Sequence, residues 1–243
     1  MSHHMTQFDT WKEARAENQL RTAMLDSVTH ELRTPLTSIK ASVTALLTNS
    51  RLRPSQRNDL LTVINEEADR MNQLVGEAVE TAHLDEGVKL DLKPHAIEKI
   101  IDAAREECRT LLGLRSISVQ LQPELPAVYA DLRVAKKALV QLLGNAAKYS
   151  PPDAPITITA ELNGKFVMTS VADRGCGIDD SEQTLIFEKF YRGKDHRYVV
   201  EGTGMGLPIA SAIIKAHGGS LCVASRLGQG CSFSFTLPID PQL

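Results

Sequence analysis

The chain has 243 residues, of which 42% are hydrophobic, so it is long enough for one large domain or two ordinary ones with real cores. Its formal net charge of −3 provides no overall basic field, which argues against nucleic acid and anionic membranes as partners. The four cysteines are scattered without a Cys-x-x-Cys pair, so the sequence suggests neither a zinc site nor a disulfide framework. Cysteines that form no disulfides are typical of a reducing, cytoplasmic location, which we therefore expect. No stretch approaches the roughly 20 apolar residues that span a bilayer, so we expect no membrane contact by this part of a protein.

Two long helices are predicted between Leu20 and about Leu84, where glycine is rare and only Pro35 and Pro54 interrupt the pattern. Both helices carry apolar residues at alternating spacings of three and four, which is typical of bundle helices. In the first helix these are Leu25, Val28, Leu32, Ile39, Val43 and Leu46, and in the second they are Ile64, Ala68, Met71, Val75, Ala78 and Ala82. We expect a kink at Pro35, a polar connection at Thr48–Arg53, and a second helix that starts at Pro54 and runs antiparallel to the first.

A two-helix hairpin buries little apolar surface, whereas two copies can close a four-helix bundle around one seam. We therefore expect a homodimer. The alternative is a monomeric hairpin that packs on its own C-terminal domain.

After Gly87 the pattern changes to short β-branched runs that alternate with helices. The predicted strands are Ser116–Leu121, Ile156–Leu162, Lys165–Val171, Ser220–Ser225 and Ser232–Leu237, with Asn163-Gly164 as a hairpin loop. The predicted helices are about Ala96–Leu112, Asp131–Lys148 and Met205–His217. This order indicates an α+β two-layer sandwich in which helices cover one face of a sheet.

His30 is the first candidate for chemistry. At 100° per residue it lies roughly 200° from Val28 and Leu32, so it should point away from the apolar stripe toward solvent. A neutral imidazole there can act as a nucleophile toward phosphorus, and the hydroxyl of Thr34, one turn later, can reach a group on the ring. Glu31 is long enough to approach the same ring. A zinc helix would need a histidine at position 34, and a solvated surface histidine remains the alternative at this point.

The common phosphate-binding loops are missing. Gly164-Lys165 is followed by phenylalanine, which excludes a P-loop, and Asp180 stands where a dinucleotide fingerprint needs glycine. His-Arg-Asp and Asp-Phe-Gly, which mark protein kinases, do not occur.

Three other segments follow one another in order. Asn145 offers an amide oxygen suited to Mg²⁺, and Lys148 on the next turn can lie near phosphate. Asp173, after an apolar strand, can accept a hydrogen bond from the amine of adenine, while Gly175 and Gly177 let the backbone approach the base.

The third segment, Gly202-Thr203-Gly204-Met205-Gly206-Leu207, leads into a helix whose first N–H groups favour phosphate. The residues between Ile178 and Glu201 should form a lid. In this lid Lys189 and Arg192 can be brought onto phosphate when Phe190 and its aromatic neighbours dock.

Together these motifs resemble a known family. Val28–Leu36 resembles the phosphoacceptor box of two-component sensor histidine kinases. Asn145, Asp173–Gly177 and Gly202–Gly206 resemble the N box and the two glycine boxes of the ATP-binding (Bergerat) domain that these kinases share with gyrase, mismatch-repair ATPases and a heat-shock chaperone. Ile186–Arg192 is similar to the phenylalanine box of the kinases, and Gly228-Gln229-Gly230 to a third, structural glycine turn.

The resemblance implies the function. ATP with Mg²⁺ would phosphorylate His30, Glu31 would assist proton removal, and the phosphoryl group would pass to an aspartate of a response-regulator receiver domain. Thr34 would orient water when the same enzyme dephosphorylates that partner. An ATPase that clamps as a dimer and a catalytically silent scaffold are the alternatives.

The resemblance also assigns the sites and domains. The implied nucleotide-binding residues are Asn145, Lys148, Tyr149, Asp173, Gly175, Gly177, Lys189, Phe190, Arg192, Gly202, Thr203, Gly204, Gly206 and Leu207. Asn145 is the stronger metal ligand, because Gln141 stands where the family usually has a second asparagine. The implied domains are 1–19, a tag remnant and incoming signalling helix; 20–86, dimerisation and phosphotransfer; 87–93, a hinge; and 94–240, ATP binding.

Overall fold

The structure, a computed structural model, describes residues 32–85, 90–193 and 203–240. The chain divides into two compact units, Met1–Gly76 and Glu77–Leu243, and each is treated by itself. Within the described ranges, no helix is long and apolar enough to cross a membrane.

The first unit contains the predicted helical hairpin. A helix over residues 32–48 is followed by a turn and by α2 (Pro54–Asp85). The turn is built by polar side chains: the Asn49 carboxamide accepts a hydrogen bond from the N–H of Arg51 at 3.1 Å, and Gln56 accepts from the N–H of Arg53 at 3.2 Å. Gln56 thus closes the first turn of α2 from the third helical position. Pro54 begins α2, as the sequence predicts.

The hairpin leaves much of its apolar surface uncovered. Among the large aliphatic side chains of the described hairpin, Leu74 is buried, with 8% of its surface exposed. The exposed large aliphatic side chains of the two helices are Leu36, Val43, Leu47, Leu61, Val75 and Val79, with exposures from 37% for Val43 to 81% for Leu47. Two of them, Val43 and Val75, belong to the predicted stripes.

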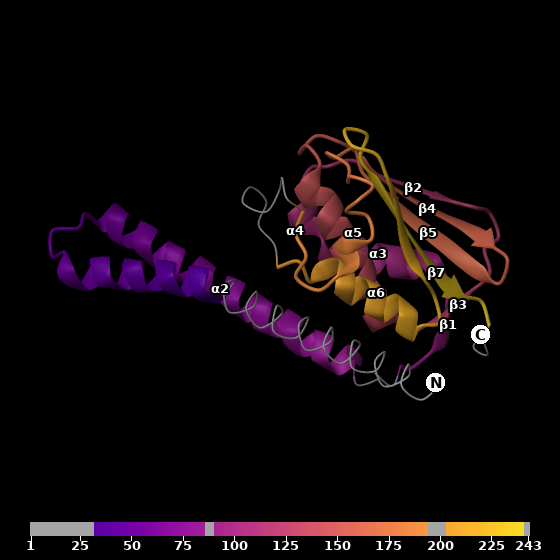
Figure 1. Cartoon of the computed structure of the whole chain (residues 1–243), viewed down its shortest axis with the longest axis horizontal. Helices are drawn as coiled ribbons and strands as arrows, with labels where there is room; N and C mark the ends of the chain where they lie inside the picture. The colour runs from indigo at the N-terminus through magenta and orange to yellow at the C-terminus, as the bar shows by residue number, and fades with distance from the viewer. Residues whose placement is uncertain (1–31, 86–89, 194–202, 241–243) are drawn as a thin grey trace, which may run out of the picture. The chain divides into compact units, whose positions relative to one another are not determined.

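The second unit is the predicted α+β sandwich. Its main sheet has the order β2-β4-β5-β7-β6, formed by Ile117–Leu121, Ile156–Asn163, Phe166–Ala172, Cys231–Pro238 and Leu221–Ser225. Strands β2 and β4 are parallel, and the other neighbours are antiparallel. Helices α3 (Ile97–Glu107), α5 (Leu132–Tyr149) and α6 (Gly206–Ala216) lie over one face of the sheet (Figure 1).

Alternation along the strands explains this layering. Ile156 and Ile158 of β4, and Phe233 and Phe235 of β7, point to the helical layer and are at most 4% exposed. Their neighbours on the other face are small and polar; Ser170 and Ser234, for example, lie 2.7 Å apart across β5 and β7. One face is therefore core, and the other is a polar surface.

Three details differ from the sequence-based expectation. The helix predicted for Ala96–Leu112 is two helices, α3 and α4 (Arg109–Leu112), because the chain leaves helical geometry at Cys108. A small antiparallel pair, β1 (Lys93–His95) and β3 (Val128–Ala130), was not predicted. The hairpin loop consists of Gly164-Lys165 and not Asn163-Gly164, since Asn163 pairs with Phe166 and the glycine takes the first loop position at φ 61°.

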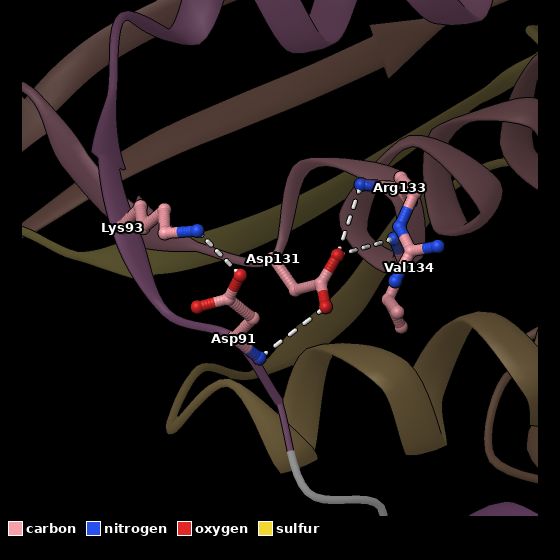
Figure 2. Close-up of polar contacts among 5 residues, drawn as sticks. All are labelled: Asp91, Lys93, Asp131, Arg133 and Val134. Carbon is pink, nitrogen blue, oxygen red and sulfur yellow. Dashed lines mark hydrogen bonds and ion pairs between the residues drawn. The ribbon is translucent and has the colours of Figure 1, made fainter.

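Asp131 ties the chain just before β1 to helix α5 (Figure 2). Its Oδ1 accepts hydrogen bonds from the N–H groups of Arg133 and Val134, which caps α5, and its Oδ2 accepts from the N–H of Asp91 at 3.3 Å. The N–H of Asp131 in turn donates to Nε2 of buried His217, at the end of α6. Asp91 itself pairs with Lys93 at 2.6 Å on the surface.

Candidate functional site

The last turns of α5 carry the first group of predicted site residues. The helix presents its apolar side, including Leu139, Leu142 and Leu143, to the core at 0% exposure. Asn145 and Tyr149 are half-buried at the edge of this contact, and Lys148 is exposed. Burial raises the pKa of Tyr149, while the nearby positive charge of Arg192 opposes that rise. Arg192, in the segment predicted to form a lid, therefore lies close to Tyr149 at the end of α5.

Asp173 follows β5 and is only 7% exposed. Its Oδ1 accepts hydrogen bonds from the N–H of Gly175 at 2.7 Å and of Cys231 at 3.3 Å. Its other oxygen, Oδ2, takes part in neither of these two bonds. Burial raises the pKa of Asp173, and these two bonds together with the charge of Arg115 oppose the rise. The geometry leaves one fixed acceptor atom for an amine such as that of adenine.

Gly175 and Gly177 are required by close contacts. A Cβ on Gly175 would overlap the carbonyl oxygen of Tyr149 and lie 2.8 Å from Oδ1 of Asp173. A Cβ on Gly177 would overlap the carbonyl oxygen of Arg226, and the backbone there has φ 75°. The loop after Asp173 is therefore pressed between the end of α5 and the turn before β7.

The second glycine segment forms the start of α6. The Thr203 hydroxyl accepts a hydrogen bond from the N–H of Met205 at 3.1 Å, which orders the entry to the helix. Gly206 begins α6, and a Cβ there would lie 2.6 Å from Oε1 of Gln141. Leu207 and its N–H group follow in the first turn, where N–H groups have no intrahelical partner. The amide oxygen of Gln141 thus faces this turn across the α5–α6 contact.

The phenylalanine segment docks against this turn. Phe187, in the short helix η1 (Leu185–Phe187), and Phe190 pack against the core. Phe190 has φ 64°, a left-handed conformation that costs a residue other than glycine about 1–2 kcal/mol. Its N–H donates to the carbonyl oxygen of Gly204 at 3.1 Å, and a Cβ on Gly204 would lie 2.8 Å from the carbonyl oxygen of Tyr191. The backbone at Phe190 and Tyr191 is thus joined to the second glycine segment.

A side-chain hydrogen bond joins the two ends of the segment over residues 182–191. The Tyr191 hydroxyl donates to Oε1 of Glu182 at 2.8 Å. Burial and this carboxylate raise the pKa of Tyr191 to about 12. Lys189 is half-buried in the same segment.

Two residues that support the first glycine segment were missed by the sequence analysis. The Ser225 hydroxyl accepts from the N–H of Ile178 and donates to the carbonyl oxygen of Gly230, both at 2.9 Å. The Gln183 carboxamide donates to the carbonyl oxygen of Ser225 at 3.1 Å. A serine at a strand end and a glutamine in a loop carry no sequence signal, because their partners are backbone atoms that only the fold brings near.

The structure therefore brings the end of α5 against the loop after Asp173, and α5 against the start of α6, and these segments carry most of the described residues of the predicted nucleotide site. His30, Glu31 and Gly202 lie outside the described residues. Thr34 lies in the first unit, on an exposed side of the helix over 32–48. Among the described residues, no three His, Cys, Asp or Glu side chains form a group that could hold a metal ion.

Comparisons with known proteins agree with both units. Residues 20–87 match the His Kinase A (phospho-acceptor) domain, and residues 130–241 match the histidine kinase-, DNA gyrase B- and HSP90-like ATPase domain. The second unit is thus an ATPase domain of that class. With the phospho-acceptor domain before it, the chain belongs to the sensor histidine kinases and contains their catalytic core.

Individual relatives support the same assignment. The chain is 27% identical to Drug sensory protein A of Synechocystis and 29% identical to sensor protein SrrB of Staphylococcus aureus, in each case over 91% of its length. It spans only 35% and 38% of these relatives. The solved structure of full-length ShkA with AMPPNP shares 30% identity over 91% of this chain and 45% of that one, with a TM-score of 0.66. For the fold alone, histidine kinase ThkA in complex with response regulator TrrA gives a TM-score of 0.73 at 22% identity, covering 97% of this chain and 67% of that one.

Proposed function

We propose that the chain transfers the γ-phosphoryl group of ATP to a ring nitrogen of His30 and then to an aspartate of a response regulator. The observation that carries the nucleotide part is Asp173, a buried carboxylate with one oxygen held by two N–H groups and the other left to accept. The ShkA structure, solved with AMPPNP, supports the same ligand class. ATP as the phosphoryl donor puts the reaction in the cytoplasm.

The residues around Asp173 have complementary tasks. The packed backbone at Gly175 and Gly177 leaves the base free to lie against the loop without side-chain obstruction. Gly204 and Gly206 bring the start of α6, with its unpaired N–H groups, to the phosphates. Arg192, close to Tyr149, and Lys189 supply positive charge from the lid. Positioning and charge neutralisation account for most of the catalysis in such transfers.

The amide oxygen of Asn145 fits Mg²⁺, which together with phosphate oxygens needs few protein ligands. Gln141 is a weaker ligand in this proposal, because its Oε1 already faces Gly206 across the helix contact. The metal would neutralise charge on the phosphates, while Lys148 lies on the solvent side of the same turn.

We propose a homodimer formed by the hairpin. The exposed aliphatic side chains of the two helices form the surface that a second hairpin would cover to close a four-helix bundle. The phospho-acceptor domain match supports this arrangement.

The second partner is a response regulator, and the complex of ThkA with TrrA is a precedent for a protein of this fold. Dephosphorylation of that partner is part of the proposal and rests on Thr34. Thr34→Ala should lose dephosphorylation of a phosphorylated regulator while it retains autophosphorylation. Thr37→Ala is the matched control, because Thr37 is an exposed threonine on the next turn of the same helix. Equal loss of both activities in Thr34→Ala would contradict the role.

The deciding experiment is incubation with γ-labelled ATP and Mg²⁺. We expect a base-stable, acid-labile label on the protein that disappears in His30→Gln and persists in His95→Gln, a histidine of β1. Asp173→Asn should also abolish labelling, since its amide can present an N–H where adenine needs an acceptor.

Other outcomes point to the alternatives. Free phosphate without labelled protein would indicate the clamping ATPase, and nucleotide binding without turnover would indicate a silent scaffold. Labelling of a heterodimer that pairs His30→Gln with Asn145→Ala would show that the transfer crosses between protomers.

A further inference from the structure

Arg115 lies outside every motif of the nucleotide site, in the short connection between α4 and β2. Its guanidinium is half-buried and reaches the C-terminal end of α5. Nη2 donates to the carbonyl oxygens of Ala147 at 3.1 Å and Ser150 at 3.4 Å. Nη1 donates to Oγ of Ser150 and the carbonyl oxygen of Pro151, both at 2.7 Å, and to that of Ala154 at 3.2 Å.

These contacts satisfy carbonyl groups at the end of α5, where the Ser150 hydroxyl also donates to the carbonyl oxygen of Ala146. The last carbonyl groups of a helix have no intrahelical partner and carry partial negative charge, so a cation there satisfies both needs. Ser150 ends α5 in an extended conformation, and no glycine follows to close a local C-cap. Arg115 therefore takes the place of the missing cap from a distant part of the chain.

The end of α5 in turn determines where the first glycine segment lies. The carbonyl oxygen of Tyr149 is packed so closely on Gly175 that a Cβ there would overlap it. Gly175 donates its N–H to Oδ1 of Asp173 at 2.7 Å. A displacement of the helix end would pass through this contact to the carboxylate.

We propose that Arg115 is a positioning residue for the nucleotide site: its guanidinium fixes the end of α5 and thereby the places of Tyr149 and Asp173. The inference rests on the proposed binding of adenine nucleotide, and Arg115 acts through other residues without contacting the nucleotide. Its charge has a second effect, since it lowers the pKa of Asp173 against the rise caused by burial. Arg115 thus supports both the position and the ionisation of the acceptor.

The charge effect can be read separately from stability. Among the residues that the structure describes, the other titratable groups that face Asp173 are the thiols of Cys176 and Cys231, and burial raises the pKa of both, so they stay uncharged near neutral pH. Arg174, the next residue, is exposed. Protonation of Asp173 removes the acceptor, so nucleotide affinity should fall as the pH falls. Loss of the Arg115 charge should move this fall to higher pH.

The experiment measures the Kd for ADP by calorimetry on the full chain from pH 5 to pH 8, together with the melting temperature without nucleotide. Arg115→Met should raise the Kd at pH 8 by about tenfold or more and shift the acid limb upward. Arg115→Lys should return the acid limb to its original pH but recover the Kd only in part, because an ammonium cannot reproduce the guanidinium fork. Arg109→Met, an α4 arginine that is 79% exposed and pairs with Glu106, should leave both readings unchanged.

A Kd for Arg115→Met within about twofold of the unaltered chain, with the acid limb unmoved, would overturn the inference, even if the melting temperature drops. Arg115 would then be structural alone, while nucleotide binding stood. Absence of ADP binding by the unaltered chain would overturn both the inference and the proposed function.

Discussion

The hairpin and the ATPase domain solve the problem of burying apolar surface in opposite ways. In the ATPase domain, Ile97, Leu139 and Phe235 are completely buried between helices and sheet. In the hairpin, Leu47 is 81% exposed and Val75 is 53% exposed. The ATPase domain has a closed core of its own, whereas the described hairpin presents aliphatic side chains that it does not bury by itself. The difference teaches that the ATPase domain can draw its stability from its own core, while the hairpin, in the proposed dimer, would draw it from association.

The largest expected effect separates the units by removing a core side chain. Phe235→Ala should destabilise the ATPase domain by about 3–5 kcal/mol, because it empties a fully buried position between β7 and the helices. Hydrogen exchange resolved by peptide should show the loss over residues 90–240 and no change over the hairpin. Leu162→Ala, at a position 43% exposed at the end of β4, should change stability by less than about 0.5 kcal/mol. A loss shared equally by the hairpin would mean that the units unfold as one.

The next effect belongs to association. Val75→Glu should raise the dissociation constant of the proposed dimer by about 100-fold or more, because a carboxylate would be buried in an apolar seam. Light scattering across a dilution series measures it. Thr62→Glu adds the same charge to α2 roughly 140° away and should leave the dimer intact. A dimer that tolerates Val75→Glu would place the interface elsewhere.

A pH effect is expected in the ATPase domain. Burial lowers the pKa of His217, whose Nε2 accepts the N–H of Asp131 and whose Nδ1 lies 2.8 Å from the carbonyl oxygen of Ile213. Since the unfolded chain binds this proton more readily, stability is fully present above the ordinary histidine pKa, about 6.5, and is lost as the pH falls below it. Denaturant unfolding at pH 7 and pH 5 should show the loss. His217→Gln should remove most of this loss of stability between pH 7 and pH 5, whereas His95→Gln should leave the loss unchanged. If the stability of His217→Gln depends on pH as strongly as that of the unaltered chain, His217 is not the responsible group.

The smallest expected effect on stability concerns Asp131, which caps α5. Asp131→Ala should cost about 1 kcal/mol, the usual value of a helix N-cap, and Asp131→Asn should cost less because its amide oxygen can still accept from Arg133 and Val134. Both variants lose the acceptor for Asp91, so the exchange of that amide should accelerate in both. Protection of Asp91 in Asp131→Asn would show that its N–H is held otherwise.

The sequence predicted the elements whose signals are local. Helices α5 and α6 and the five strands of the main sheet appear within a few residues of their predicted bounds, because apolar periodicity reports which face is buried. β1 and β3 were missed because three-residue strands, one containing Pro94, are too short to show a period. The break at Cys108 was missed because an apolar pattern continues through it.

The candidate site divides in the same way. Asp173, Gly175 and Gly206 could be predicted because their residue types are unusual in those places and follow one another in a recognisable order. Arg115, Ser225 and Gln183 could not, since each acts on backbone atoms of a segment far away in the sequence. For Gln141 the sequence suggested metal binding through its amide, which stays a prediction. The sequence did not indicate that this amide lies against Gly206, as the fold shows.

The parallel pairing of β2 with β4 has a consequence for the order in which the protein folds. The β4–β5 hairpin joins neighbouring residues and can form early, whereas pairing β2 with β4 closes a loop that contains β3 and all of α5. Contacts that close long loops form late, because their entropy cost comes before their reward. The contacts of Arg115 with the end of α5 span a similar stretch of chain, so we expect them to form after the β4–β5 hairpin. The pairing of β5 with β7 closes a still longer loop, which contains η1, α6 and β6, and we expect it to form later still.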